Sequence, residues 1–259
     1  FLRNALVKGS NRVDVPRDKV AFDEADNNPQ AYKTHGGSLK ATYDFGNTTL
    51  TSISAYETTS GYSRGDTDGG AAADYPVNGL PNGYGQSMGQ VQDLDQFTQE
   101  LRLASNATDP WSWQVGAFYF DGRDTTDFYQ RAWFLTTPAH NPNNWVRLRN
   151  INTSWAGFGQ VSWKATDALT LTAGLRATKD EKSTRLLKTA DTAAGLVTYK
   201  GRHNVEMSDT QPSWDLSAMY EVSPELSLYA RVARGFRGPT IQGRSAVFNA
   251  DFTTADSET

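Results

Sequence analysis

The stretch FGQVSWKATDALTLTAGLRAT (158–178) decides the fold. From Leu169 to Ala177 the odd positions hold Leu, Leu, Ala, Leu and Ala, whereas the even positions hold Thr, Thr, Gly and Arg. Residues two apart share one face of a β-strand, so this strand has an apolar face and a polar face. The polar gap KATDAL (164–169) has the composition of a tight turn. The stretch therefore predicts an antiparallel hairpin.

Three further stretches repeat this order of strand, short polar turn and strand. They are 38–56, 99–120 and 213–236, and their turns read FGNTT, NATDPWS and EVSPEL. Within 48–57 the alternation is weaker, because Leu50 and Tyr56 are out of phase with Ile53. This break predicts a β-bulge in that strand.

The arginines Arg231, Arg234 and Arg237 recur every third residue, as in a basic stripe on a helix. The residues around them follow a period of two instead, with Leu226, Leu228, Ala230 and Val232 on one face. We therefore predict a strand, with Arg231 and Arg237 on its polar face and Arg234 pointing the other way.

Short and long connections alternate along the chain. The long gaps run over 64–96, 123–150 and 180–207, with flanks at 1–36 and 238–259. Loops of this length argue against a compact soluble domain. They are expected in a transmembrane β-barrel, which has short periplasmic turns and long extracellular loops. Candidates for the aromatic belts of such a barrel are Trp111, Trp113, Trp155, Trp163 and Trp214.

The predicted fold class is all-β, an antiparallel transmembrane β-barrel. The predicted strands are 38–46, 48–64, 96–106, 111–130, 150–165, 168–181, 207–222 and 225–237. Eight strands can close a small barrel. Because both flanks resemble loops, we expect residues 1–259 to form part of a larger barrel domain instead.

Composition narrows the function. Lys and Arg number 25 against 29 Asp and Glu, which disfavours general nucleic-acid binding. The 259 residues include no cysteine, so neither disulfides nor Cys-ligated zinc are expected. Aromatic residues make up 12% although mean hydropathy is −0.60, and no apolar run is long enough for a membrane helix.

No motif for covalent chemistry is present. His35, His140 and His203 are far apart, and the calcium-like Asp66-Thr67-Asp68-Gly69 lacks the full ligand pattern. No nucleophile motif or phosphate-binding glycine loop is found. We therefore expect no catalytic residue, no metal and no cofactor.

Three stretches carry a family resemblance: QELRLAS (99–105), FGQVSWKATDALTLTAGLRATKDEK (158–182) and LYARVARGFRGPTIQGR (228–244). They resemble the barrel domain of TonB-dependent outer-membrane receptors, most of all those of sphingomonad and caulobacter type. TLTSISAYETTSGYSRGD (49–66) is similar to earlier barrel strands of the same family.

The resemblance implies a barrel of about 22 strands closed by a plug domain. It implies import of a scarce nutrient (siderophore-bound iron, haem, cobalamin or an oligosaccharide), driven by TonB and its inner-membrane motor complex. On this interpretation residues 1–259 are a partial barrel domain, and the plug, the TonB box and the C-terminal strands lie outside this chain. The implied location is the outer membrane of a Gram-negative bacterium.

Two sets of residues are candidates for ligand binding. Loop aromatics can stack on a sugar or catecholate ring, or else pack the loops together; they are Tyr75, Tyr84, Trp133, Phe134 and Trp145. Arginines of the polar face can attract an anionic ligand; they are Arg102, Arg176 and Arg231. Alternatively these arginines pair with carboxylates of neighbouring strands, such as Glu100, Asp215 and Glu221.

Two rival functions remain open. One is a passive porin-like channel, and the other is a soluble all-β carbohydrate-binding or glycosidase domain; an adhesin is a weaker third. For the receptor, specificity is expected in the connections 64–96, 123–150 and 180–207. Deleting most of 64–96 is predicted to spare folding and to weaken ligand binding.

Overall fold

The structure, a computed structural model, describes residues 30–66, 85–107, 110–132, 143–191 and 204–241. The elements are β1 (Gln30–Asp44), β2 (Thr48–Asp66), β3 (Gly85–Ser105), β4 (Trp111–Ala132), β5 (Asn143–Lys164), β6 (Leu169–Asp191), β7 (Asn204–Ser223) and β8 (Leu226–Arg234). They form one antiparallel sheet in which the strands follow the order of the sequence. The described residues hold no helix that is long and apolar enough to cross a membrane.

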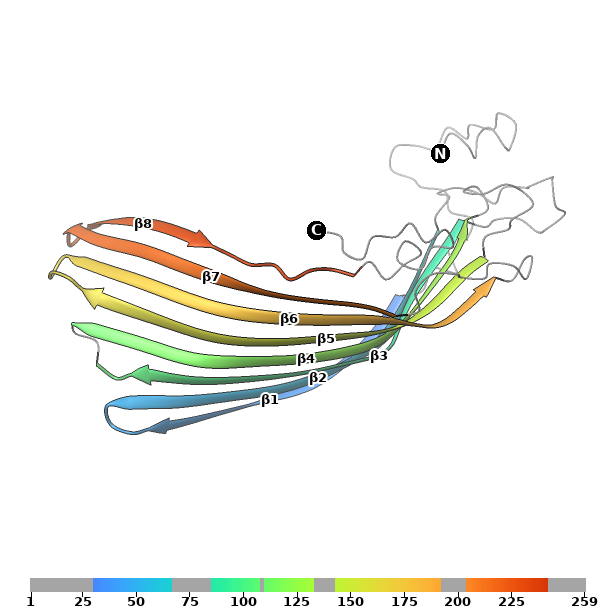
Figure 1. The fold of residues 1–259 in the computed structure, drawn as a ribbon, viewed down its shortest axis with the longest axis horizontal. Helices are drawn as coiled ribbons and strands as arrows, with labels where there is room; N and C mark the ends of the chain where they lie inside the picture. The colour runs from blue at the N-terminus through green and yellow to red at the C-terminus, as the bar shows by residue number, and fades with distance from the viewer. Residues whose placement is uncertain (1–29, 67–84, 108–109, 133–142, 192–203, 242–259) are drawn as a thin grey trace, which may run out of the picture.

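Figure 1 shows a long, curved sheet with its short turns gathered at one end. The predicted hairpins and the alternation of short and long connections are therefore confirmed. Among the described strands, β1 and β8 each pair with a single neighbour, so the sheet is open. The structure does not show a small closed barrel of eight strands.

All the strands except β8 are longer than their sequence pattern predicts. β3 begins at Gly85 rather than at residue 96, β5 begins at Asn143 rather than at 150, and β6 runs to Asp191 rather than to 181. The proposed loops 64–96, 123–150 and 180–207 are wrong in these bounds. Alternation ends where the apolar face ends, but backbone pairing continues beyond it, and pairing leaves no pattern in the sequence.

The bulge predicted within 48–57 is also wrong. Ile53 pairs with Lys40 on β1 and with Glu100 on β3 in an unbroken register. Its side chain lies on the opposite face from Leu50 and Tyr56, because it is an odd number of residues away from each. The register of β2 shifts instead between Thr59 and Gly61.

Three register shifts lie at one level of the sheet, whereas a fourth, between Glu221 and Ser223, lies near the turn between β7 and β8. The three lie between Thr59 and Gly61, between Val91 and Asp93, and between Arg147 and Leu148. The pairs Gly61–Val91, Val91–Thr126 and Thr126–Leu148 place all three shifts side by side. Bulges bend a strand and increase its twist. Figure 1 shows the long strands turning sharply towards their far ends.

The strand around Arg231 is shorter than predicted. β8 ends at Arg234, so Arg237 lies beyond the strand and does not share a strand face with Arg231. Two glycines after the strand explain why it ends here. Gly235 directly follows Arg234 and Gly238 follows Arg237, and glycine weakens strand pairing. The backbone at Gly238 passes close to the carboxylate of Asp180 on β6, which would have to move if position 238 carried a side chain.

Asn106 joins the first two turns of the sheet. Its Nδ2 donates to Asp44 Oδ1 over 2.9 Å and to the carbonyl of Gly46 over 2.7 Å, and its Oδ1 accepts from Thr49 Oγ1 over 2.6 Å. Gly46 has a φ of 89°, in the left-handed region that glycine tolerates best. The turn between β1 and β2 is thus held by a side chain from the end of β3.

Asn106→Ala is expected to lower the free energy of unfolding by about 1–2 kcal/mol, because it removes three side-chain hydrogen bonds at an exposed site. Unfolding of the complete protein from detergent micelles by urea measures this change. Asn47→Ala is the matched control, since the Asn47 side chain has no hydrogen bond within the described part of the chain. An equal loss in both variants would contradict the role of Asn106.

Candidate functional site

The two faces of the sheet differ in chemistry. On β6, Leu171 and Leu175 lie on one face, which we call the apolar face; Thr172, Arg176 and Thr178 lie on the other, the polar face. Large exposed side chains of the apolar face include Leu39, Leu50, Leu101, Val115, Val161, Leu175, Leu216, Leu228 and Val232. So large an apolar surface is typical of a wall that meets lipid.

Aromatic rings border the apolar face at two levels. Near the turns, the rings of Trp111 and Trp163 stack with centroids 5.1 Å apart at 7°. Further along the same strands, the rings of Tyr119 and Trp155 lie 4.2 Å apart. Eight residue steps separate the two levels, which is about 27 Å along a strand and about 20 Å at a tilt of about 40°. This height matches the apolar band of a membrane barrel.

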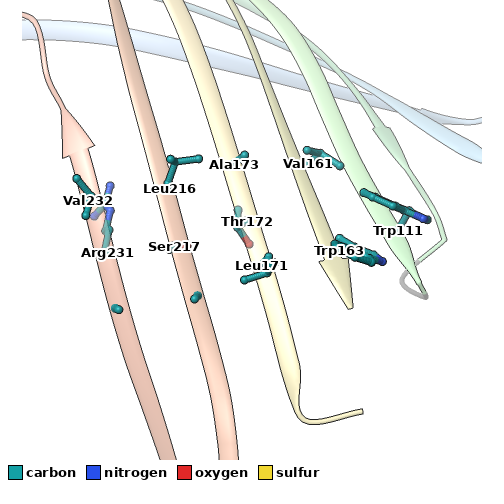
Figure 2. A pocket seen from close by; sticks show the side chains of 12 residues that line it. Trp111, Val161, Trp163, Leu171, Thr172, Ala173, Leu216, Ser217, Arg231 and Val232 are labelled. Atoms are coloured by element: carbon teal, nitrogen blue, oxygen red, sulfur yellow. The ribbon is translucent and has the colours of Figure 1, made fainter. Parts of the chain in front are cut away.

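All five tryptophans that the sequence assigned to aromatic belts are exposed on the apolar face. Figure 2 shows this face near the turns, where Trp111 of β4 and Trp163 of β5 lie parallel beside Val161 and Leu171. The shallow hollow between them continues over Leu216 and Val232. Most of the residues that line this hollow are apolar and belong to the apolar face, so we place no polar ligand there.

Two of the three candidate arginines on the polar face pair with carboxylates. Arg102 forms an ion pair with Glu100 on its own strand, with Nε donating to Glu100 Oε1 over 3.0 Å. Arg231 of β8 forms an ion pair with Asp215 of β7. Glu221, the third proposed carboxylate, makes no ion pair with any residue in the described part of the chain. Charge pairing along this wall accounts for Arg102 and Arg231.

Arg176 is different. Its guanidinium carbon lies 5.4 Å from the ring centre of Phe118 and 5.8 Å from that of Phe158. Its Nε donates to Thr178 Oγ1 over 3.0 Å. Within the described ranges it forms no ion pair with a carboxylate. We call Arg176, Phe118 and Phe158 the arginine platform.

A glycine makes the platform possible. Gly116 pairs with Phe158 in the register of β4 and β5, and the Phe158 ring lies directly over it. A Cβ at position 116 would meet the ring of Phe158 and would lie 2.6 Å from the carbonyl oxygen of Leu101. The sequence did not single out Gly116, Phe118 or Phe158, because their relation depends on pairing between strands.

A second polar cluster lies beyond the aromatic belts, at the line of register shifts. Arg147 donates to both carboxylate oxygens of Asp127, over 2.6 Å and 2.8 Å, and Gln92 donates to Asp127 over 2.8 Å. The Asp127 side chain is 4% exposed. These hydrogen bonds raise the pKa of the Arg147 guanidinium. We call Gln92, Asp127 and Arg147 the bend cluster.

Further side-chain hydrogen bonds lie at the same level, on both faces of the sheet. Arg149 donates to Thr125 over 2.8 Å and to Asp93 over 3.2 Å. Asn150 donates to Asp124 and accepts from Thr184, each over 2.8 Å. Hydrogen bonds therefore connect β3, β4, β5 and β6 at the level where the sheet bends.

Asp124 lies five residues beyond Tyr119 and outside the apolar band. Burial raises the pKa of its carboxyl, although the hydrogen bond from Asn150 and the charge of Arg149 act in the opposite direction. The folded protein therefore binds this proton more tightly than the unfolded chain does. The resulting stabilisation is present at low pH and is lost as the pH rises through the folded pKa.

Asp124→Asn is accordingly expected to raise the free energy of unfolding at neutral pH, by up to about 1 kcal/mol. Asparagine keeps an oxygen that accepts from Asn150 and removes the buried charge. The gain is expected to shrink at acidic pH, where the wild-type carboxyl is protonated. Urea unfolding midpoints of both proteins across the pH range measure this, and a gain that grows on acidification would contradict it.

Several predicted residues cannot be placed in a site. Tyr75, Tyr84, Trp133 and Phe134 lie outside the described residues. Trp145 belongs to β5, where it pairs with Tyr129 and Ala190, but its side chain is not among those described. The described residues hold no group of three or more His, Asp or Glu side chains arranged for a metal ion.

The sequence and the fold were compared with known proteins. A family model described as "TonB dependent receptor-like, beta-barrel" matches residues 3–258. The ferric yersiniabactin uptake receptor FyuA from Yersinia pestis has a similar fold, with a TM-score of 0.58 and 17% identity over 79% of this chain and 29% of that chain. No match was found among curated proteins.

The ferric-catecholate import receptor Fiu from E. coli K12, in its open form, is also similar. Its TM-score is 0.50, with 13% identity over 78% of this chain and 35% of that chain. This chain therefore spans about a third of the length of these two receptors. Barrels of this family lie in the outer membrane of Gram-negative bacteria, so the apolar face meets lipid and the polar face lines the lumen. Together with the sheet, its two faces and its aromatic belts, the match shows that the chain belongs to the TonB-dependent receptor β-barrel family.

Proposed function

We propose that the complete protein imports a scarce nutrient across the outer membrane, with energy that TonB and its inner-membrane motor complex supply. The family match over residues 3–258 carries this proposal. The open eight-stranded sheet supports it, because a lumen wall of this width belongs to a large barrel. The plug domain and TonB box that such import requires would lie outside this chain.

A ferric siderophore is the substrate that the comparisons favour. Both similar structures are receptors for ferric compounds, ferric yersiniabactin in one and a ferric catecholate in the other. Haem, cobalamin and oligosaccharides are the remaining substrate classes. In each case the protein binds its cargo without covalent chemistry, so the function is transport and not catalysis.

Uptake of radioactive iron by whole cells tests the proposal. Cells that express the complete protein as their sole receptor of this type are given ferric yersiniabactin or a ferric catecholate, with and without TonB. Uptake that depends on both the receptor and TonB supports energised import. Uptake through the protein that is unchanged in cells lacking TonB would instead support the passive channel.

The connection between β2 and β3 is expected to contribute to specificity. Deleting 64–96, as the sequence suggested, would remove the first twelve residues of β3, which pair with β2 and β4. The better deletion covers 68–83 and replaces it with a short Gly-Ser turn, since Asp66 already pairs with Gln86. Binding of the ferric siderophore is expected to weaken at least about tenfold.

Assembly of the deletion variant is checked by its resistance to SDS at low temperature and by its amount in the outer membrane. Normal assembly with weaker binding supports a role for the connection in recognition. Normal assembly with unchanged affinity would exclude 68–83 as a determinant of specificity.

A further inference from the structure

The arginine platform holds a positive charge on the lumen wall without a neutralising partner in the described residues. The other two arginines first considered there, Arg102 and Arg231, are each paired with a carboxylate. Arg176 meets two aromatic rings instead. Ring faces attract a cation but carry no net charge, so the rings position the guanidinium and leave its charge uncompensated.

No carboxylate of the described wall forms an ion pair with Arg176, although Asp215 lies diagonally opposite it across β6 and β7. Glu100 and Asp215 are engaged by Arg102 and Arg231. Asp180 lies on the same face of β6 four residues away, which is about 13 Å along the strand. Among the described residues, therefore, the carboxylate nearest to Arg176 in the register, Asp215, is already bonded to Arg231.

The platform is also preorganised. Thr178 Oγ1 accepts from Nε of Arg176, which fixes the guanidinium and leaves its two terminal nitrogens as donors. The ring of Phe158 lies over Gly116, where a Cβ would also meet the backbone oxygen of Leu101. Small residues surround the arginine on the wall, with Gly174 on its own strand and Ser213 opposite it on β7. Arg176 is half-buried, and neither of its terminal nitrogens donates a hydrogen bond within the described part of the chain.

We propose that the arginine platform is an anion-binding site that takes a carboxylate, above all one attached to a planar or aromatic body. A carboxylate accepts two parallel hydrogen bonds from a guanidinium, and the rings of Phe118 and Phe158 provide apolar contact beside it. This inference rests on the proposed function, because it requires that the polar face lines the path of import. The carboxylate comes either from a free anion in the lumen or from a side chain of the polypeptide outside this chain.

Chemical labelling of the complete protein in detergent tests the site without requiring transport. Phenylglyoxal reacts with accessible guanidinium groups, and mass spectrometry after chymotrypsin digestion reports the rate at Arg176. Benzoate is the anionic probe, and benzamide is its neutral analogue. Ser213→Cys places a thiol beside the platform in a chain that has no cysteine, and N-ethylmaleimide then measures general access to the wall.

If the site takes a free anion, Arg176 is labelled readily, and benzoate slows the labelling about tenfold whereas benzamide does not. If a carboxylate of the polypeptide occupies the site, Arg176 resists phenylglyoxal while the cysteine at position 213 still reacts with N-ethylmaleimide. The proposal would be overturned if Arg176 and the cysteine at position 213 are both labelled rapidly, or both labelled slowly, and benzoate does not change the labelling of Arg176.

These outcomes separate the site from the transport function. Labelling reports occupancy of Arg176 whether or not iron uptake occurs, so a failed uptake experiment leaves this result intact. Conversely, uptake that depends on TonB while labelling shows no anion effect would reject the site and leave the proposed function standing.

Discussion

Asp127→Ala is expected to lower the free energy of unfolding of the complete protein by about 2–4 kcal/mol. The Asp127 side chain is nearly inaccessible and accepts hydrogen bonds from Arg147 and Gln92. Its loss leaves the positive charge of Arg147, which is 30% exposed, without this carboxylate, and it leaves Gln92 without its acceptor. Partial access of water to Arg147 keeps the cost below that of a fully buried pair.

Asp127→Asn separates charge from shape, since it keeps the size of the side chain and one accepting oxygen. It is expected to cost about half as much as alanine, because one hydrogen bond from Arg147 remains possible. Asp121→Ala is the control, because Asp121, which is 18% exposed and also accepts from Tyr119, pairs with an arginine, Arg123, whose side chain is 53% exposed. Exposed pairs contribute less than about 1 kcal/mol.

Urea unfolding from micelles, followed by tryptophan fluorescence, measures all three variants. Equal effects of Asp127→Ala and Asp121→Ala would show that the bend cluster has no special contribution. A loss of stability in Asp127→Ala alone would show that the bend cluster, which lies outside the membrane at the level of the bulges, stabilises the sheet.

Gly116→Ala is expected to lower the free energy of unfolding by about 1–3 kcal/mol. The added methyl group would meet the ring of Phe158 and would lie 2.6 Å from the backbone oxygen of Leu101 on the neighbouring strand. The ring can rotate away, but a paired backbone cannot move without disturbing β3. Displacement of Phe158 also removes one of the two rings that hold Arg176.

Gly157→Ala provides the matched control, because a Cβ at position 157 meets nothing within 4 Å. Alanine there is expected to be neutral or slightly stabilising, since it restricts the unfolded chain. Heat denaturation followed by circular dichroism compares the two variants. A loss of similar size at both positions would mean that glycine is needed for the backbone and not for the platform.

The sequence alone determined the fold class, the order of the hairpins and the face of the sheet on which each residue between the aromatic belts lies. These follow from a period of two and from turn composition, both of which are local properties. Glu100 was among the carboxylates expected to pair with the arginines, and it meets Arg102 two residues away on the same strand. Arg123 and Asp121 have the same spacing, but the sequence did not single them out. No register is needed to bring such neighbours together.

Only the tertiary structure decided which distant residues meet. Asp127 and Arg147 pair because β4 and β5 align them directly, and Arg231 reaches Asp215 diagonally across β7 and β8. Arg176 has the same sequence pattern as Arg102 and Arg231, yet it lies on Phe118 and Phe158 rather than on a carboxylate. The physical reason is that register and bulges set contacts between strands, and each depends on the whole sheet and not on any one stretch of sequence.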